Sequence, residues 1–167
     1  MGVIKFVRRD IVNNMKADII NPFVTGALSV LRQLLPSSEI KQGELSIKKE
    51  YSFLGEQLII INFFGDLEGL FIFDMKEETS IKVSEIMNST VLNLYNGMVT
   101  ATIKEMANMI AGKAISYLRE SGICFDISTP EIITASSFSA PEKITKILHI
   151  PIDTKVGRIV INIALSS

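Results

Sequence analysis

The chain has 167 residues, of which 47% are hydrophobic and 21% are charged, and its formal net charge is −1. This length and composition indicate one globular domain over residues 1–167 and exclude a disordered or fibrous protein. The near-zero charge provides no single-sign field of the kind that favours nucleic acid or an anionic membrane surface. We therefore expect no nucleic-acid partner and no membrane partner.

The cysteine content and the length of the apolar runs indicate where in the cell the protein is located. Cys124 is the only cysteine, so no internal disulfide can form, which suits a reducing compartment. The N-terminus alternates polar and apolar residues and lacks the uninterrupted apolar stretch of a signal peptide. Apolar runs such as Leu58–Ile61 are too short to span a bilayer. The sequence predicts a soluble, cytoplasmic protein.

The first half of the chain predicts one helix followed by strands. A helix is expected over Asn21–Leu35, with Pro22 in its first turn. Alternation over Glu44–Tyr51 predicts a strand. Two β-rich runs flank Gly65–Gly69 and predict a hairpin. Because Leu58–Phe64 is apolar on both alternations, it should be a central strand that helices cover on at least one side.

Two further helices are expected next. The first covers Lys76–Asn88, and its core-facing side chains are predicted to be Ile81, Val83, Ile86 and Met87. The second is a longer helical region over Thr90–Leu118, softly broken at Asn96-Gly97 and ended by Gly122.

The end of the chain predicts a second hairpin after a loop at Thr129-Pro130. Its strands are Ile144–Pro151 and Val156–Leu165, and Pro151 suggests an edge position or a bulge. The order of helix, strands, helices, loop and strands predicts an α+β fold with long helices packed on a mainly antiparallel sheet.

A helical wheel divides the long helix into two faces. One face is apolar and should point to the core: Val99, Ile103, Met106, Ile110, Ala114 and Tyr117. The opposite ridge carries Ala101, Glu105, Asn108 and Gly112. Glu105 and Asn108 are neighbours one turn apart, between two small residues that would let a partner surface come close. Polar residues on an outer helix face are usually only solvated, so a wider pattern is needed before this pair counts as a site.

The chain offers no self-sufficient hydrolase machinery. His149 lies between Leu148 and Ile150 in a predicted strand, where a structural role is expected. Cys124 has no identifiable neighbouring base. We find no His, Asp and Glu cluster with metal-ligand spacing and no Gly-rich phosphate loop, so no metal or cofactor of its own is expected. A catalyst of this kind would have to complete an active site on another protein.

The wider pattern is a four-position signature. In the CheC/CheX/FliY family of response-regulator phosphatases, an Asp or Ser is followed by Glu four residues later, Asn three further on, and Pro after about 22 more. Glu105, Asn108 and Pro130 fit this spacing, whereas Ala101 departs from it at the first position. The second Glu-x-x-Asn pair, Glu85 and Asn88, has no proline at the required distance and is interpreted as a decoy.

Other segments of the chain also resemble this family. "INPFVTGALSVLRQL" is similar to the opening helix of the family, and "GDLEGLFIFDM" with "SIKVSEIM" is similar to its hairpin and following helix. The chain therefore resembles this family, and CheX in particular, from about Ile20 onward. The resemblance implies a CheX-like fold, a homodimer, and a phosphorylated CheY-like receiver as the partner, which would bring the aspartyl phosphate, Mg²⁺ and a lysine.

Given that substrate, the resemblance assigns roles to the ridge. Glu105 would clamp the partner's lysine, and Asn108 would hold the attacking water in line, because a carboxamide both donates and accepts hydrogen bonds. Ala101, Gly112 and Pro130 are expected to contact the partner. The alternative is a non-catalytic binding or adaptor module of the same fold, for a receiver or a flagellar motor protein. Ala101 at the first signature position favours that alternative.

Overall fold

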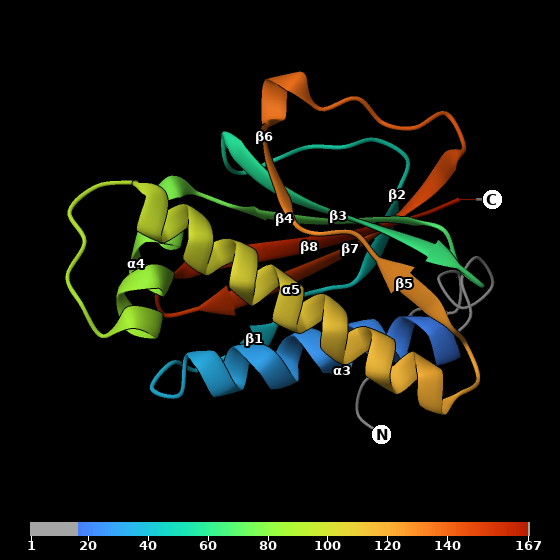
Figure 1. The fold of residues 1–167 in the computed structure, drawn as a ribbon, viewed down its shortest axis with the longest axis horizontal. Helices are drawn as coiled ribbons and strands as arrows, with labels where there is room; N and C mark the ends of the chain where they lie inside the picture. Colours follow the sequence, from blue (N-terminus) through green and yellow to red (C-terminus); the bar gives the residue numbers. More distant parts are fainter. Residues whose placement is uncertain (1–16, 167) are drawn as a thin grey trace.

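The computed structural model describes residues 17–166, and Figure 1 shows helices packed on a sheet. The N-terminal residues on which the signal-peptide expectation rests lie outside this range. In chain order, the elements are α3 (Ala17–Leu34), β1 (Lys41–Gln42), β2 (Ser46–Lys48), β3 (Gln57–Gly65), β4 (Gly69–Met75), α4 (Glu77–Asn88), α5 (Gly97–Glu120), β5 (Phe125–Ile127), β6 (Glu131–Thr134), the 3₁₀ turn η1 (Ala135–Ser137), β7 (Ile144–Thr154) and β8 (Gly157–Ser166).

The strands form one sheet in the order β1-β7-β8-β4-β3-β5, with β2 also paired to β7 and β6 also paired to β3. Every pairing among the described strands is antiparallel. The predicted α+β class, with long helices on a mainly antiparallel sheet, is confirmed. Both predicted hairpins, β3–β4 and β7–β8, are present.

The main core lies between the sheet and the helices α3 and α5. Phe23 of α3 meets Phe71 of β4 with ring centroids 5.3 Å apart, and Phe63 of β3 lies 5.1 Å from Phe71. The two helices approach closely at Gly26, where an added Cβ would come within 3.1 Å of the Ala114 backbone nitrogen. Thus α5 is held on two sides, by the sheet and by α3.

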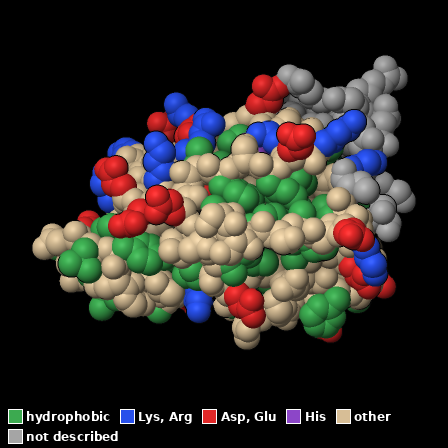
Figure 2. All heavy atoms as spheres, turned by 90° about the horizontal axis from the view of Figure 1, so that it is seen from above, with side chains coloured by type: hydrophobic (Ala, Val, Ile, Leu, Met, Phe, Trp, Pro, Cys, Tyr) green, Lys and Arg blue, Asp and Glu red, His purple; other side chains and the backbone are tan. Residues whose placement is uncertain are grey.

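A smaller apolar cluster lies on the other face of the sheet, and it includes Leu58, Ile60 and Ile72. The aromatic side chains Tyr51 and Phe138 pack over it, with ring centroids 4.9 Å apart. Figure 2, seen from the side of β6 and η1, shows hydrophobic side chains gathered near the middle of this face and charged side chains along its margins. Burial on both faces explains why the strand over Leu58–Phe64 is apolar on both alternations, as predicted for a central strand.

Two predicted element boundaries in the first half are wrong. Helix α3 already includes Ala17, so Pro22 lies inside it and not in the first turn. Proline there removes one backbone donor and crowds an earlier carbonyl, but burial of Ile20 and Phe23 on either side outweighs that cost. The expected strand Glu44–Tyr51 shrinks to β2, because the chain leaves the sheet and turns Tyr51 into the smaller cluster.

The predicted helical region Thr90–Leu118 begins later than expected. Ser89 adopts φ 51° and ends α4, and α5 starts only at Gly97. Asn96 does not break a helix softly but caps one, because its Oδ1 accepts from the backbone N–H of Met98 (3.0 Å) and Val99 (3.2 Å). Helix α4 matches its prediction apart from one residue at its start, although Ile86 is exposed and not in the core. Gly122, at φ 82°, ends α5 as expected.

Pro151 occupies an interior strand, which corrects the expectation of an edge position. Strand β7 pairs with β8 on one side and with β1 and β2 on the other. The carbonyl of Pro151 accepts from the Gly43 N–H (2.8 Å), in the gap between the β1 and β2 ladders. The position where proline lacks an N–H donor therefore faces the gap between β1 and β2, where no ladder hydrogen bond is lost. The register shift in β7 lies elsewhere, between Ile144 and Lys146.

Candidate functional site on helix α5

Helix α5 displays the two faces that the wheel predicts. Val99, Ile103, Met106, Ile110 and Ala114 are buried, and Tyr117 is half-buried. Ala101, Glu105, Asn108 and Gly112 are all exposed on the opposite ridge. Since three residues of helix rise about 4.5 Å, the Glu105 and Asn108 side chains stand next to each other on a helix whose inner face is fixed by the core.

The functional groups of this pair are free within the described part of the chain. Neither the Glu105 carboxylate nor the Asn108 carboxamide has a hydrogen bond or ion pair with any residue in 17–166. The fold does not use them, so both remain available to a partner.

The second Glu-x-x-Asn pair, on α4, is engaged by the fold. Glu85 Oε1 accepts from the Leu92 N–H (3.1 Å). Asn88 Nδ2 donates to the Ser84 carbonyl (2.8 Å) and to Thr102 Oγ1 (2.8 Å), which ties α4 to α5. These contacts give Glu85 and Asn88 a structural role and agree with the interpretation of this pair as a decoy.

The threonines that flank Ala101 do not replace the missing polar group of the signature. Thr102 is buried, and its hydroxyl donates to the Met98 carbonyl (2.7 Å) while it accepts from Asn88. Thr100 lies on a different side of the helix from the ridge. The ridge therefore has a methyl group where the signature has a carboxylate or a hydroxyl.

Gly112 has no packing reason to be glycine. A Cβ built at this position meets nothing within 4 Å, although glycine inside a helix costs roughly 0.5–1 kcal/mol relative to alanine. The ridge therefore has no side chain at Gly112, at one end, and only a methyl group at Ala101, at the other end.

Pro130 lies beside α5 and not on the ridge. It is half-buried in the loop that links β5 and β6, and both of these strands pair with β3 and contact α5. The structure thus brings Ala101, Glu105, Asn108 and Gly112 together on one surface, with Pro130 on a neighbouring segment.

The remaining titratable side chains that stand out are bound into the fold. His149 Nδ1 is hydrogen-bonded to Asn162 Oδ1 (2.9 Å), and burial lowers the pKa of His149. Asp74 is fully buried and accepts from the N–H groups of Leu54 (2.6 Å) and Gly55 (2.9 Å), while burial raises its pKa. No sequence pattern pointed to Asp74, whose contacts fix the loop before β3.

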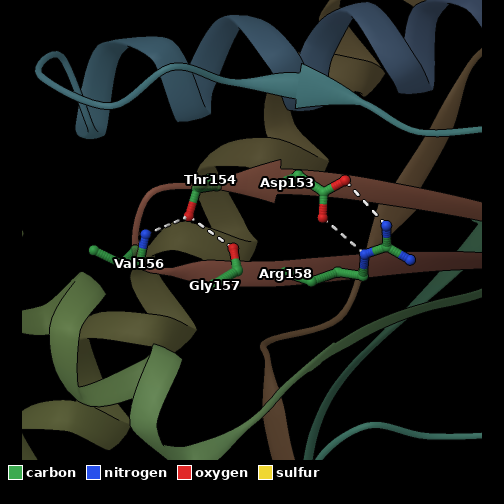
Figure 3. A network of polar contacts seen from close by, with 5 residues as sticks. All are labelled: Asp153, Thr154, Val156, Gly157 and Arg158. Atoms are coloured by element: carbon green, nitrogen blue, oxygen red, sulfur yellow. Dashed lines mark hydrogen bonds and ion pairs between the residues drawn. The ribbon is translucent and has the colours of Figure 1, made fainter.

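The tip of the β7–β8 hairpin carries a second polar network (Figure 3). Arg158 Nε and Nη2 donate to the two carboxylate oxygens of Asp153 at 2.8 and 3.0 Å. This bidentate pair lowers the pKa of Asp153 and raises that of Arg158. Thr154 Oγ1 donates to the Gly157 carbonyl and accepts from the Val156 N–H, which shapes the turn. The network is satisfied internally and serves the hairpin.

Neither a metal-binding cluster nor a membrane-spanning helix occurs in residues 17–166. No group of three or more His, Cys, Asp or Glu side chains there comes together in a way that could hold a metal ion. Within the same range, every helix is too short or too polar to cross a membrane. Cys124 is exposed and free.

Comparisons with known proteins place the chain in a family. Residues 58–153 match the family model described as chemotaxis phosphatase CheX. The CheY-P phosphatase CheX of Thermotoga maritima is 28% identical over 121 residues, which cover 72% of this chain and 77% of that protein.

Solved structures agree in fold. The CheX of Vibrio vulnificus superposes with a TM-score of 0.78 at 26% identity, over 90% of this chain and 100% of that one. A CheX–CheY–BeF3–Mg²⁺ complex from Borrelia burgdorferi gives a TM-score of 0.74 at 29% identity, covering 89% of this chain and 97% of the matched chain. With more than half of its length matched by the CheX model, the chain is a member of the CheC/CheX/FliY family and is most similar to its CheX members.

Proposed function

We propose that this protein is a phosphatase that hydrolyses the aspartyl phosphate of a CheY-type response regulator in chemotaxis or related two-component signalling. One observation carries the proposal: Glu105 and Asn108 stand exposed and unengaged by residues 17–166 on a helix that the core holds rigid. The similarity to a CheY-P phosphatase from Thermotoga maritima supports the same reaction.

In this proposal, Asn108 positions the attacking water. Its carboxamide is too weak a base to remove a proton, but it can donate to and accept from one water molecule and hold it in line with the phosphorus. The water oxygen bonds to phosphorus as the phosphorus–oxygen bond to the receiver's aspartate breaks. The aspartate leaves as a carboxylate, and inorganic phosphate is released. Phosphoryl transfer gains most of its rate from such positioning and from electrostatics.

Glu105 acts as a clamp in the same complex. A carboxylate close to a phosphoryl group is repelled unless it meets a cation, and a lysine beside the receiver's phosphoryl site would be that cation. The ion pair would fix the ridge in the receiver's active site and place Asn108 over the phosphorus. We assign the partner-binding roles to Ala101 and Gly112, whose small size permits close approach, and to Pro130 beside the helix.

The receiver would contribute the metal. A complex of CheX with CheY, BeF3 and Mg²⁺ is known from Borrelia burgdorferi, and we infer that the Mg²⁺ of this reaction is held by the receiver. The phosphatase itself would add no cofactor, only a carboxylate and a carboxamide.

The test is the lifetime of the phosphorylated receiver. Catalytic amounts of the protein should speed the release of phosphate well beyond the receiver's own rate. A stable complex with the phosphorylated receiver that leaves this rate unchanged would support the adaptor module instead, as Ala101 suggests. The absence of any complex would reject both functions.

We further infer that the whole chain is one CheX-like domain that forms a homodimer. The short strands β1 and β5 end the main path of the sheet and present a surface on which a second copy could pair. Light scattering at micromolar concentration should give twice the 18.5 kDa chain mass. A single species at the chain mass would reject the dimer.

A further inference from the structure

Exposed apolar side chains gather just before the catalytic ridge. Among the described residues, Val91, Leu94 and Met98 are 78%, 62% and 48% exposed, and they fall within eight residues of the chain. We call these three side chains the 91–98 patch. Apart from Tyr95, no residue from Ser89 to Met98 has an ionisable side chain. Clustered apolar exposure without charge is typical of a protein-binding surface.

The backbone that carries the patch is anchored. The Leu92 N–H donates to Glu85 Oε1 (3.1 Å), and the side chains of Leu92 and Tyr95 pack against the main core. Asn96 then caps α5. Inward Leu92 and Tyr95 alternate with outward Val91 and Leu94, so the loop presents its apolar side chains from fixed positions.

Met98 connects the 91–98 patch to the ridge. Met98 precedes Ala101 by three residues and Glu105 by seven, so at 100° per residue all three lie in one stripe of α5. At 1.5 Å per residue, Met98 is about 10 Å from Glu105 along the helix axis. In Figure 1, the loop before α5 extends outward from the same end of this helix.

The typical size of a protein interface connects the 91–98 patch with Glu105 and Asn108. A stable interface covers about 800 Å² on each partner, which corresponds to a footprint wider than 10 Å in every direction. A protein whose phosphoryl site meets Glu105 and Asn108 therefore also covers Met98, which adjoins the loop that carries Val91 and Leu94.

We propose that the 91–98 patch is the docking surface for the receiver, and that it binds apolar side chains on the receiver's face beside the phosphoryl site. This inference rests on the proposed function and assigns a different task to each part of the surface. Glu105 and Asn108 act on the reacting group, whereas the patch supplies affinity and selects the receiver. Because its contacts are the same before and in the transition state, the patch should affect KM and not the rate at saturation.

The test replaces Val91 and Leu94 together by serine and measures affinity for a CheY-type receiver loaded with Mg²⁺ and BeF3⁻. We expect the dissociation constant to rise by about tenfold or more, since two apolar side chains would no longer be removed from water in the complex. KM for the phosphorylated receiver should rise in parallel, with kcat unchanged. Leu94→Met, which keeps an apolar side chain, should retain wild-type affinity.

Phe64→Ser is the matched control. Phe64 is 51% exposed and pairs with Asp126 of β5. Figure 1 shows β5 at the end of the molecule opposite the loop before α5. Its substitution removes a similar apolar surface and should leave the dissociation constant unchanged. An equal loss of affinity in Phe64→Ser would overturn the inference, because exposed apolar surface in general would then be responsible.

Two other outcomes also decide against the patch. Unchanged affinity in the double variant would remove its docking role, and a loss of dimer without a change in affinity would assign the patch to a second copy of this chain. If the wild-type protein binds the receiver but does not dephosphorylate it, the proposed function fails while the affinity comparison still decides the docking role. If the wild-type protein does not bind the receiver, both proposals fail.

Discussion

Two Glu-x-x-Asn pairs occur in this chain, and their surroundings differ. Glu85 and Asn88 are hydrogen-bonded to the loop before α5 and to α5 itself. The side chains of Glu105 and Asn108 form no hydrogen bond or ion pair with residues 17–166. Spacing alone does not separate the pairs, but the hydrogen bonds do, because a side chain that already completes the fold is not available for a partner.

Removing the charge of Glu105 should weaken binding to the receiver and leave the stability of the fold almost unchanged. Glu105→Gln keeps the size of the side chain and loses the proposed ion pair, so it should weaken binding to the Mg²⁺/BeF3⁻-loaded receiver and slow turnover. The free energy of unfolding should change by no more than about 0.5 kcal/mol, as expected for a surface site. Glu120→Gln, an exposed carboxylate in the last turn of the same helix, is the control. Equal effects of the two changes on binding would contradict the clamp.

His149 should make stability depend on pH. Its pKa in the folded state is lowered, first by burial and also by the charges of Lys48 and Arg158, against the hydrogen bond to Asn162. An unfolded histidine titrates near pH 6.5, so below that pH the unfolded state binds a proton that the folded state does not. The free energy of unfolding should therefore fall as pH falls from about 6.5 to the lowered pKa.

Urea titrations across this pH range would measure the effect. His149→Asn retains a polar partner for Asn162 and cannot titrate, so its stability should lose this pH dependence. Asp74 acts with the opposite sign, because its raised pKa lets the folded state bind a proton before the unfolded state does as pH falls. An unchanged profile in His149→Asn would show that another group causes the slope.

At the scale of elements, α5 shows what the sequence could predict. Its two faces follow from the period of the helix, so the buried Val99 and Ile103 and the exposed Glu105 and Asn108 were all predicted correctly. Its start was not, because Asn96 can interrupt a helix or cap one. The residues before it are apolar enough to continue a helical pattern, and for this reason the exposed patch at Val91 and Leu94 was missed.

The sheet shows a second limit of sequence patterns. Pro151 was expected at an edge position or a bulge, and it lies at neither. The proline faces a gap between β1 and β2, and the pairing of these two short strands with β7 depends on segments far away in the sequence. Likewise, burial around Pro22 overrides its local preference for a first turn. Long-range packing decides both cases, and local patterns do not contain it.

The N-cap of α5 should contribute measurably to stability. Asn96→Ala leaves the N–H groups of Met98 and Val99 without their acceptor and should lower the free energy of unfolding by about 1 kcal/mol. Asn96→Asp keeps the acceptor and should retain most of the stability. Asn93→Ala, at an exposed position in the preceding loop, should have almost no effect. Chemical denaturation of the three variants would measure this, and equal losses at both asparagines would contradict the cap.

At the scale of the whole molecule, folding and turnover should respond differently to a chelator. No group of metal-ligating side chains comes together in residues 17–166, and the Mg²⁺ of the proposed reaction belongs to the receiver. Chelation should therefore leave the circular dichroism and thermal unfolding of the isolated protein unchanged while it stops phosphate release from the receiver. A loss of helicity in chelator would contradict this division.

The central claim is that Asn108, on an exposed ridge, positions the water that attacks the receiver's phosphoryl group. It is tested most directly by single-turnover phosphate release, measured beside affinity for the Mg²⁺/BeF3⁻-loaded receiver, in Asn108→Ala and Asn88→Ala. Asn108→Ala should slow release by on the order of 10²-fold, as for the loss of one preorganised donor, with affinity and stability retained.

Asn88→Ala should do the reverse. It removes the hydrogen bonds to Ser84 and Thr102, so stability should fall by about 1 kcal/mol while phosphate release stays close to the wild-type rate. Asn88 and Asn108 each follow a glutamate by three residues. The expected result is that Asn108→Ala slows phosphate release without loss of stability, whereas Asn88→Ala lowers stability without slowing release. Wild-type release by Asn108→Ala would contradict the account, since the ridge would then bind the receiver without acting on its phosphate.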